Sequence, residues 1–250
     1  MDSSKSSGEG TSLAALSARD LKAIMRAIEA LNEYAGHNWE ARLPKPLRKR
    51  KTYVVRVDLA EMKPPVWRRL VVASDLTMEQ FGVVIEASFG WTGYHLHSFD
   101  LWVEARASYF HRLLTRYDIE QEGEEGLAEA DVQLCQVLVK PGDKVLYTYD
   151  FGDNWRHRVR LETVSDWTPD APLAQCVGGR RACPPEDCGG PWGYGMLLSR
   201  MGEQHGDDAE SDDFWGELPV DFDPASFDLD EINHRLDSEA RGGFVHPSIW

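Results

Sequence analysis

The chain has 250 residues, of which 42% are hydrophobic, and its formal net charge at pH 7 is −15. That length is enough for one large domain with a substantial core, or for one domain with an extension. A chain this acidic repels phosphate backbones, so we expect no nucleic acid partner unless a local basic patch binds one. No stretch approaches the roughly eighteen apolar residues of a membrane span, which excludes a membrane-spanning protein.

The first residues, "MDSSKSSGEG", lack the apolar core of a secretory signal, and we therefore expect a cytoplasmic protein. In that compartment cysteines are normally reduced thiols rather than disulfides. Residues 1–12 are rich in serine and glycine, and this composition predicts a disordered N-terminus.

Residues 13–50 predict a helical extension followed by a basic linker. Apolar side chains recur every three or four residues from Leu16 to Leu31, as on one face of a helix that ends near Gly36. The next segment, "RLPKPLRKRK", is either a solvated hinge or a docking strip for an acidic surface or nucleic acid. The hinge is favoured because no aromatic residues interleave with the cations. If the extension docks, an unknown protein partner would bind through residues 13–51.

Residues 51–237 show the pattern of an α+β domain, and residues 238–250 are expected to be a C-terminal tail. "TYVVRVDL" and "VWRRLVV" predict a hairpin, and "DKVLYTYDFGDNWRHRVRLETV" predicts two strands around the turn "DFGDN", with Gly152 at positive φ. A helix is expected between the capping pair Thr77 and Gln80 and a stop at Gly90, and another after Asp228. Because strands and helices do not alternate regularly, we expect a mixed or antiparallel sheet of hairpins packed against a few helices.

Three histidines in the predicted strands are candidate metal ligands. The alternation in "YHLHSFDLWV" puts His95 and His97 on one strand face, where two imidazoles can chelate Zn, Fe or Mn. His157, Asp150 or Glu186 would complete the set, and Asp153 or Glu186 would serve as base in metal-assisted hydrolysis or oxidation. The competing interpretation, which the pattern favours, is a pair of histidines in a half-polar core.

The stretch "CVGGRRACPPEDCGG", residues 176–190, has three interpretations. Cys176, Cys183 and Cys188 could bind zinc together with a histidine, although only the second spacing fits the two to four residues usual between zinc ligands. The glycines with Arg180 and Arg181 could hold an anion, but no Walker motif is present. The favoured interpretation is a proline-stiffened loop, a crowded turn that aims its two carboxylates, Glu186 and Asp187, inward or onto Arg68 or Arg69.

Four blocks of the sequence together resemble one known family. They are "PPVWRRLVV", "FGWTGYHLHSF", "YDFGDNWRHRV" and "ACPPEDCGGPWGY", in this order, and "FDPASFDLDEIN" follows. The chain resembles the plasmid pRiA4b ORF-3-like family, whose members are associated with plasmids and mobile elements, from about residue 51 to residue 236. The resemblance implies an α+β domain and implies no activity. The aspartate-rich run at residues 207–217 departs from the family pattern.

The leading functional hypothesis is a non-catalytic binding or regulatory module, because no complete catalytic set is present. The alternative is a metal-dependent hydrolase or oxidase that uses His95, His97 and His157, and a DNA-associated accessory protein comes third because the charge disfavours it. Zinc is the cofactor that the cysteines and histidines together suggest, and iron or manganese would also suit the histidine pair. The candidate binding residues are Arg68, Arg69, Trp91, Asp150, Trp155 and Asp187; the candidate metal ligands are Cys176, Cys183, Cys188, His95, His97 and His157; the candidate catalytic residues are Asp153 and Glu186.

Overall fold

The computed structural model describes residues 43–102, 110–124, 126–202 and 218–246. The chain divides after Leu43 into two units, and every element below belongs to the second unit, Pro44–Trp250. The predicted disordered N-terminus, the predicted N-terminal helix and the acidic run at 207–217 lie outside the described residues. No helix within the described ranges has the length and apolar character needed to cross a bilayer.

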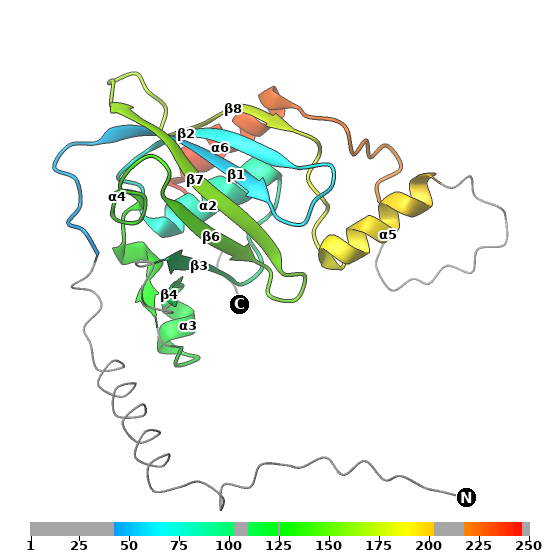
Figure 1. Ribbon diagram of the computed structural model, residues 1–250, viewed down its shortest axis with the longest axis horizontal. Helices are drawn as coiled ribbons and strands as arrows, with labels where there is room; N and C mark the ends of the chain where they lie inside the picture. Colours follow the sequence, from blue (N-terminus) through cyan, green and yellow to red (C-terminus); the bar gives the residue numbers. More distant parts are fainter. Residues whose placement is uncertain (1–42, 103–109, 125, 203–217, 247–250) are drawn as a thin grey trace, which may run out of the picture. The chain divides into compact units, whose positions relative to one another are not determined.

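Eight strands form one sheet in the order β5-β4-β3-β6-β7-β1-β2-β8 (Figure 1). All neighbouring strands are antiparallel except β4 and β5, which are parallel. This mixed sheet with its helices confirms the predicted α+β class. The strands are β1 (Lys51–Leu59), β2 (Trp67–Ala73), β3 (His97–Trp102), β4 (Phe110–Leu114), β5 (Leu127–Ala128), β6 (Lys144–Tyr149), β7 (Trp155–Asp166) and β8 (Ala174–Arg180).

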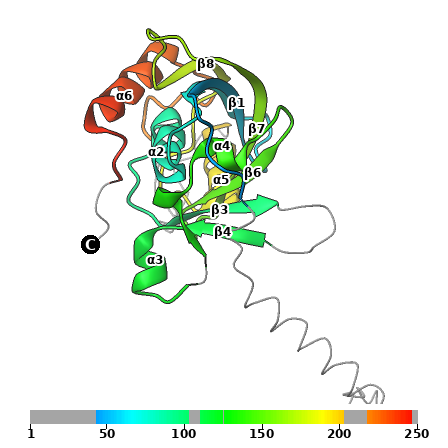
Figure 2. The same ribbon diagram turned by 90° about the vertical axis from the view of Figure 1, so that its left-hand side faces the viewer.

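Helix α2 lies against one face of the sheet, and α6 packs beside α2 and β8 (Figure 2). The predicted capping box of α2 is present, since the Thr77 side chain accepts from the Gln80 amide and the Gln80 side chain accepts from the Thr77 amide. Gly90 ends this helix in the left-handed conformation, as predicted. The helices are α2 (Met78–Phe89), α3 (Arg116–Glu120), α4 (Leu134–Val137), α5 (Gly190–Gly202) and α6 (Leu229–Gly242), with a 3-10 turn η3 (Glu129–Asp131).

The core consists of cross-strand rows of side chains that face α2. Leu59, His157, Tyr147 and Phe99 are neighbours across β1, β7, β6 and β3, and all four are buried. The next row contains Trp155, Tyr149 and His97, which are also buried. Because side chains alternate along a strand, aligned registers place every second residue of four strands in one core.

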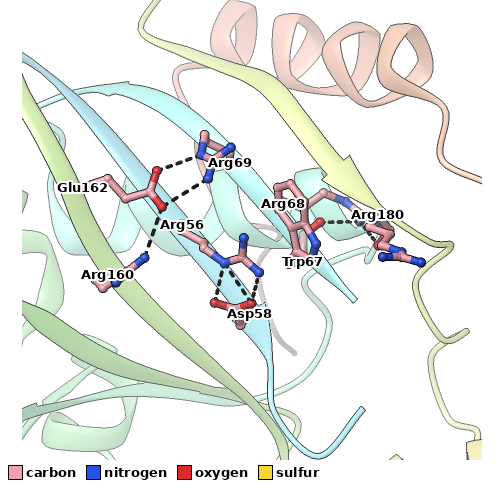
Figure 3. Close-up of polar contacts among 8 residues, drawn as sticks. All are labelled: Arg56, Asp58, Trp67, Arg68, Arg69, Arg160, Glu162 and Arg180. Atoms are coloured by element: carbon pink, nitrogen blue, oxygen red, sulfur yellow. Dashed lines mark hydrogen bonds and ion pairs between the residues drawn. The ribbon is translucent and has the colours of Figure 1, made fainter. Parts of the chain in front are cut away.

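The opposite face of the central strands is polar and rich in arginine (Figure 3). Arg56 forms a bidentate pair with Asp58, and the Glu162 carboxylate accepts from both Arg69 and Arg160. The hydrogen bond from Arg69 holds the pKa of Glu162 below its usual range. Ion pairs therefore neutralise part of a solvent-facing basic surface that the alternation of β1, β2 and β7 creates.

Local details of three segments differ from the sequence-based expectation. In the "DFGDN" turn the positive φ angles belong to Asp150 (55°) and Asn154 (57°), not to Gly152. Asp150 adopts this conformation because its carboxylate accepts from the Gly152 and Asp153 amides. The first part of residues 176–190 is edge strand β8 rather than turn, since it pairs with β2. Helix α6 runs to Gly242, beyond the expected end of the domain at residue 237.

Two adjacent glycines of β8 provide a matched test of this packing. A Cβ atom at Gly179 would lie 2.3 and 2.7 Å from ring carbons of Phe227, whereas a Cβ atom at Gly178 meets nothing within 4 Å. We expect Gly179→Ala to lower the free energy of unfolding by about 1–3 kcal/mol through overpacking. Gly178→Ala should change it by less than about 1 kcal/mol, in the stabilising direction. Urea unfolding of both variants checks this, and equal effects would contradict the described contact.

Candidate functional site

The loop of residues 181–189 is attached to the sheet by a set of directed hydrogen bonds. The indole N–H of Trp91 donates to the carbonyl of Pro184 at 2.9 Å. The Glu186 carboxylate accepts from the amide and hydroxyl of Thr92 and from the hydroxyl of Tyr149. Burial and this carboxylate raise the pKa of Tyr149 well above its ordinary value, so the phenol remains a donor. The predicted proline-stiffened loop thus lies over the segment that precedes β3 and over the end of β6.

The same loop is held at its far end by the turn between β6 and β7. The amide of Gly189 donates to the Asp153 carboxylate at 3.1 Å. A Cβ atom at Gly190, where φ is 66°, would lie 2.3 Å from the Asp153 carbonyl oxygen. The close approach explains why this position requires glycine. Asp153, which the sequence suggested as a catalytic base, therefore makes a structural contact with the loop.

Of the two expected arrangements, pairing of the loop carboxylates with Arg68 or Arg69 is not present, and Glu186 points inward instead. Glu186 bonds Tyr149 and Thr92 as described above. Asp187 lies beside His95 instead, with 3.2 Å between Oδ1 and Nε2. The other ring nitrogen of His95 is 3.7 Å from Asp150 Oδ2. His95, Asp150 and Asp187 thereby form a group whose ligand atoms all lie within 4.8 Å of one another.

The three histidines predicted as one cluster occupy three separate environments. His95 precedes β3, is half-buried and contacts the loop. His97, the first residue of β3, is 1% exposed and lies 2.9 Å from the Glu129 carboxylate. His157 is fully buried, with Phe89, Trp91 and Tyr147 rings around it. The prediction that His95 and His97 share a strand face was wrong, because β3 begins only at His97.

Burial among aromatic rings lowers the pKa of His157 to about 3. Backbone groups of Tyr147 and Trp155 raise this pKa, but by less than burial lowers it. His157 is therefore a neutral core side chain. Trp155 belongs to the same aromatic cluster, since its ring lies 5.7 Å from that of Trp91. Trp91 also stacks on Tyr149 at 5.1 Å. These two tryptophans, predicted as binding residues, form the support beneath the loop.

The three cysteines of residues 176–190 do not meet as ligands. Among the described residues, the groups with ligand spacing contain no thiol. Burial raises the pKa of Cys176, of Cys183 and, to about 12, of Cys188. The protonated thiol is a poor metal ligand. The Cys176 thiol instead donates to the Gly178 carbonyl, which is consistent with small buried residues in a crowded strand and loop.

A cavity of about 450 Å³ lies between the loop, the end of α2, the first half of α6 and residues 219–228. This volume falls within the roughly 300–1,000 Å³ typical of small-molecule sites. Its walls combine aromatic rings and prolines with three guanidinium groups. Its lining includes Arg68, Phe89, Trp91, Arg181, Glu186, Phe227, Asp228 and Arg235.

Arg68 is the buried cation of this cavity and is 3% exposed. Its side chain points inward from β2 and lies between the rings of Phe89 and Phe227. The guanidinium carbon is 5.0 Å from the Phe89 ring centroid and 5.2 Å from the Phe227 ring centroid. Arg68 donates to the carbonyls of Ser88, Trp67 and Arg180. No described carboxylate lies within ion-pair distance of it, and burial lowers its pKa. An arginine nevertheless keeps its charge in proteins.

The adjacent Arg69 shows the opposite arrangement (Figure 3). Because neighbouring residues of a strand point to opposite faces, Arg69 lies on the polar face and donates to Glu162 at 2.7 Å. The sequence suggested both arginines as binding residues. Arg68 is a buried cation without a carboxylate partner among the described residues, whereas Arg69 forms an ion pair at the surface. Only Arg68 belongs to the cavity.

Two further arginines complete the positive lining and were not singled out together by the sequence. Arg181, with φ of 69°, begins the loop directly after β8. Arg235 of α6 lies 3.6 Å from Glu231 through Nη1, and its Nε is buried without a hydrogen-bond partner among the described residues. The signal for Arg68 was present in the sequence, since Arg68, Leu70 and Val72 alternate inward. No sequence signal links Arg235 to this place.

The fold and the site together define an α+β protein with one large sheet and a loop-covered cavity. A sequence profile of the plasmid pRiA4b ORF-3-like proteins matches residues 51–231, so the chain belongs to that family. It is 30% identical over 189 residues to the uncharacterized protein y4hQ of Sinorhizobium fredii (strain NBRC 101917 / NGR234), covering 74% of this chain and 91% of y4hQ.

A crystal structure is also similar to this fold. It is that of the protein of unknown function MM3350 from Methanosarcina mazei Go1, with a TM-score of 0.62 and 31% identity. The match covers 73% of this chain and 98% of that chain. These similarities establish the family and the fold, and the chemistry must be argued from the residues themselves.

The buried His157 predicts how the stability of the protein depends on pH. The imidazole is protonated below about pH 6.5 in the unfolded chain, but only near pH 3 in the folded chain. The unfolded state therefore binds the extra proton between these values, and the free energy of unfolding falls as pH falls through this window. Between about pH 7.5 and about pH 5, the free energy of unfolding should fall by about 2 kcal/mol less in His157→Leu than in the wild type.

Urea unfolding of wild type and His157→Leu at both pH values measures this difference. At about pH 7.5 both side chains are neutral, so this measurement reports the packing change alone. An equal pH dependence in the two proteins would contradict a neutral core histidine.

Proposed function

We propose that the protein is a non-catalytic binding module whose cavity takes a small organic anion, a carboxylate or a phosphate monoester. The observation that carries the proposal is Arg68: a cation that is 3% exposed, lines the cavity and has no carboxylate partner within reach among the described residues. Burying an uncompensated charge is costly, and an anionic ligand would offset that cost on binding.

The hydrogen-bonding capacity of Arg68 supports an oxyanion as ligand. Its Nε and Nη1 already donate to backbone carbonyls, and none of the described acceptors bonds its Nη2. A planar guanidinium held in one orientation by three carbonyls and two rings is preorganised for a directed donor contact. A ligand oxygen at Nη2 would complete its donor set.

The charges of the remaining lining cancel, so Arg68 leaves the cavity with a net charge of +1. Arg181 and Arg235 add two cations, and Glu186 and Asp228 add two carboxylates. Both carboxylates already accept hydrogen bonds, Glu186 from Thr92 and Tyr149, and Asp228 from the Glu231 amide. The apolar part of a ligand would meet Phe89, Trp91 and Phe227. An anion that carries an aromatic or aliphatic group fits these walls better than a bare inorganic ion.

Calorimetric titration with phenyl phosphate, benzoate and inorganic phosphate tests the proposal. We expect phenyl phosphate or benzoate to bind more tightly than inorganic phosphate. Arg235→Gln and Arg68→Gln should weaken binding at least about tenfold, because each removes a charge-assisted hydrogen bond.

Arg69→Gln is the matched control, since it removes the same charge one residue away on the opposite face of the sheet. It should leave the affinity unchanged. The less buried Arg235 decides the question if Arg68→Gln does not fold. Absence of binding by the wild type, or equal weakening by Arg69→Gln, would overturn the proposal.

A second candidate function is metal-assisted hydrolysis at His95, Asp150 and Asp187. The observation that favours it is the spacing of their ligand atoms, within 4.8 Å, at a half-exposed position where a substrate could enter. One imidazole and two carboxylates suit Zn or Mn, and such an ion activates a bound water as nucleophile. This set replaces the predicted one, because His97 and His157 lie elsewhere in the core.

Hydrolysis of bis(4-nitrophenyl) phosphate in the presence of Mn²⁺ or Zn²⁺ tests this candidate. Asp187→Asn removes an exposed ligand and should reduce the metal-dependent rate at least about tenfold while leaving the fold intact. A rate that is the same in the variant, or in buffer without protein, excludes this function.

A further inference from the structure

A second polar cluster lies inside the protein and shares no residue with the cavity lining. Glu86 of α2, His97 of β3 and His246, which follows α6, offer ligand atoms that all lie within 4.8 Å of one another. Glu86 and His97 are 3% and 1% exposed, and the side chain of His246 is 12% exposed. Three segments that are far apart in the sequence therefore bring two imidazoles and one carboxylate together.

We propose that Glu86, His97 and His246 bind one divalent transition-metal ion, with zinc as the preferred ion. Two imidazoles and one carboxylate form a donor set that suits zinc and related ions. The separations fit a site that contracts on binding: His97 Nδ1 is 4.0 Å and His246 Nδ1 is 3.6 Å from Glu86 oxygens. Tetrahedral zinc with bonds of about 2.0–2.1 Å separates its ligand atoms by about 3.4 Å.

Buried nitrogen atoms without partners provide independent support. Nδ1 of His97 and both ring nitrogens of His246 are buried, and none of them has a hydrogen-bond partner in the described part of the chain. Buried polar atoms in proteins are normally hydrogen-bonded. The two rings stack with centroids 4.4 Å apart and an angle of 18°, so they stand side by side above Glu86. A metal ion would satisfy Nδ1 of His97 and Nδ1 of His246 together.

The surrounding residues resemble the outer shell of a metal site. His97 Nε2 contacts the Glu129 carboxylate at 2.9 Å, and with an ion bound this contact would keep the proton on Nε2 and leave Nδ1 as the ligand. A carboxylate behind a ligating histidine is common in zinc sites. The Tyr147 hydroxyl bonds to Glu86 Oε1 and orients that carboxylate. Neither Glu129 nor Tyr147 needs to touch the ion.

The charges of such a site also balance. Glu86 and Glu129 together carry two negative charges when ionised, both imidazoles are neutral as ligands, and a divalent cation makes the sum zero. Buried ionic groups are tolerated when they are compensated in this way. The ion would fasten the segment after α6, which includes the buried Phe244, to the core helix α2.

Metal analysis of the purified, full-length chain tests the proposal. The protein is treated with chelator, supplied with Zn²⁺ or Co²⁺ and separated from free ion, and bound metal is counted by mass spectrometry. We expect one ion at the cluster, a Co²⁺ absorption spectrum without thiolate charge-transfer bands, and an unfolding temperature that rises with added Zn²⁺.

Two variants and one control localise the ion. His246→Ala should lose the ion and the Zn²⁺-dependent rise in unfolding temperature. Glu129→Gln keeps all three ligands and should weaken binding by about 10–100-fold. Asp187→Asn, which disrupts the separate group at His95, should leave this ion bound.

Retention of the ion by His246→Ala, loss of it in Asp187→Asn, thiolate bands in the Co²⁺ spectrum, or no bound ion at all would each overturn the proposal. Circular dichroism of His246→Ala shows whether the fold persists. If this variant does not fold, Glu129→Gln decides the question, and an unchanged affinity in it counts against the site. The anion titration uses different residues, so failure of either proposal leaves the other standing.

Discussion

The hydrogen bond from the Trp91 indole to the Pro184 carbonyl is the contact on which the organisation of the candidate site depends. Trp91 itself rests on Tyr149 and Trp155, so the core rows of the sheet fix where the loop can lie. Once the loop is placed, one side of it closes the arginine-lined cavity and the other presents Asp187 to His95. This contact and the hydrogen bonds of Glu186 and Gly189 together build both surfaces, and the core aromatics provide their rigid support.

Strand alternation explains how a chain with a net charge of −15 acquires a cavity with a buried arginine. Arg68 and Arg69 are consecutive, yet one faces the core side of the sheet and the other pairs with Glu162 on the polar side. The inward arginine is stabilised by the carbonyl of Ser88 in the last turn of α2, where the helix dipole is negative. Its charge is therefore partly compensated by dipoles, and the rest is available to a ligand. The overall charge of a protein does not determine the potential inside one cavity.

Local patterns predicted much of the fold. The β1–β2 hairpin, the capping box of α2 and the Asp228 cap of α6 each depend on neighbouring residues, and all three are confirmed. The candidate site depends instead on long-range placement, which spacing cannot supply. His95 and His97 are two residues apart, but the start of β3 separates their environments. Nothing in the sequence connects Glu86 with His246, which lies 160 positions later. Partners of this kind are set by which elements pack together, not by sequence distance.

Amide hydrogen exchange of residues 181–190 in wild type and in Trp91→Phe tests the central contact most directly. Phenylalanine keeps an aromatic ring on Tyr149 but removes the donor to the Pro184 carbonyl. We expect faster exchange across this loop, including the Gly189 amide that bonds Asp153, while the free energy of unfolding falls by only about 1 kcal/mol. Unchanged exchange rates in the loop would show that it is positioned independently of Trp91 and would contradict this description of the site.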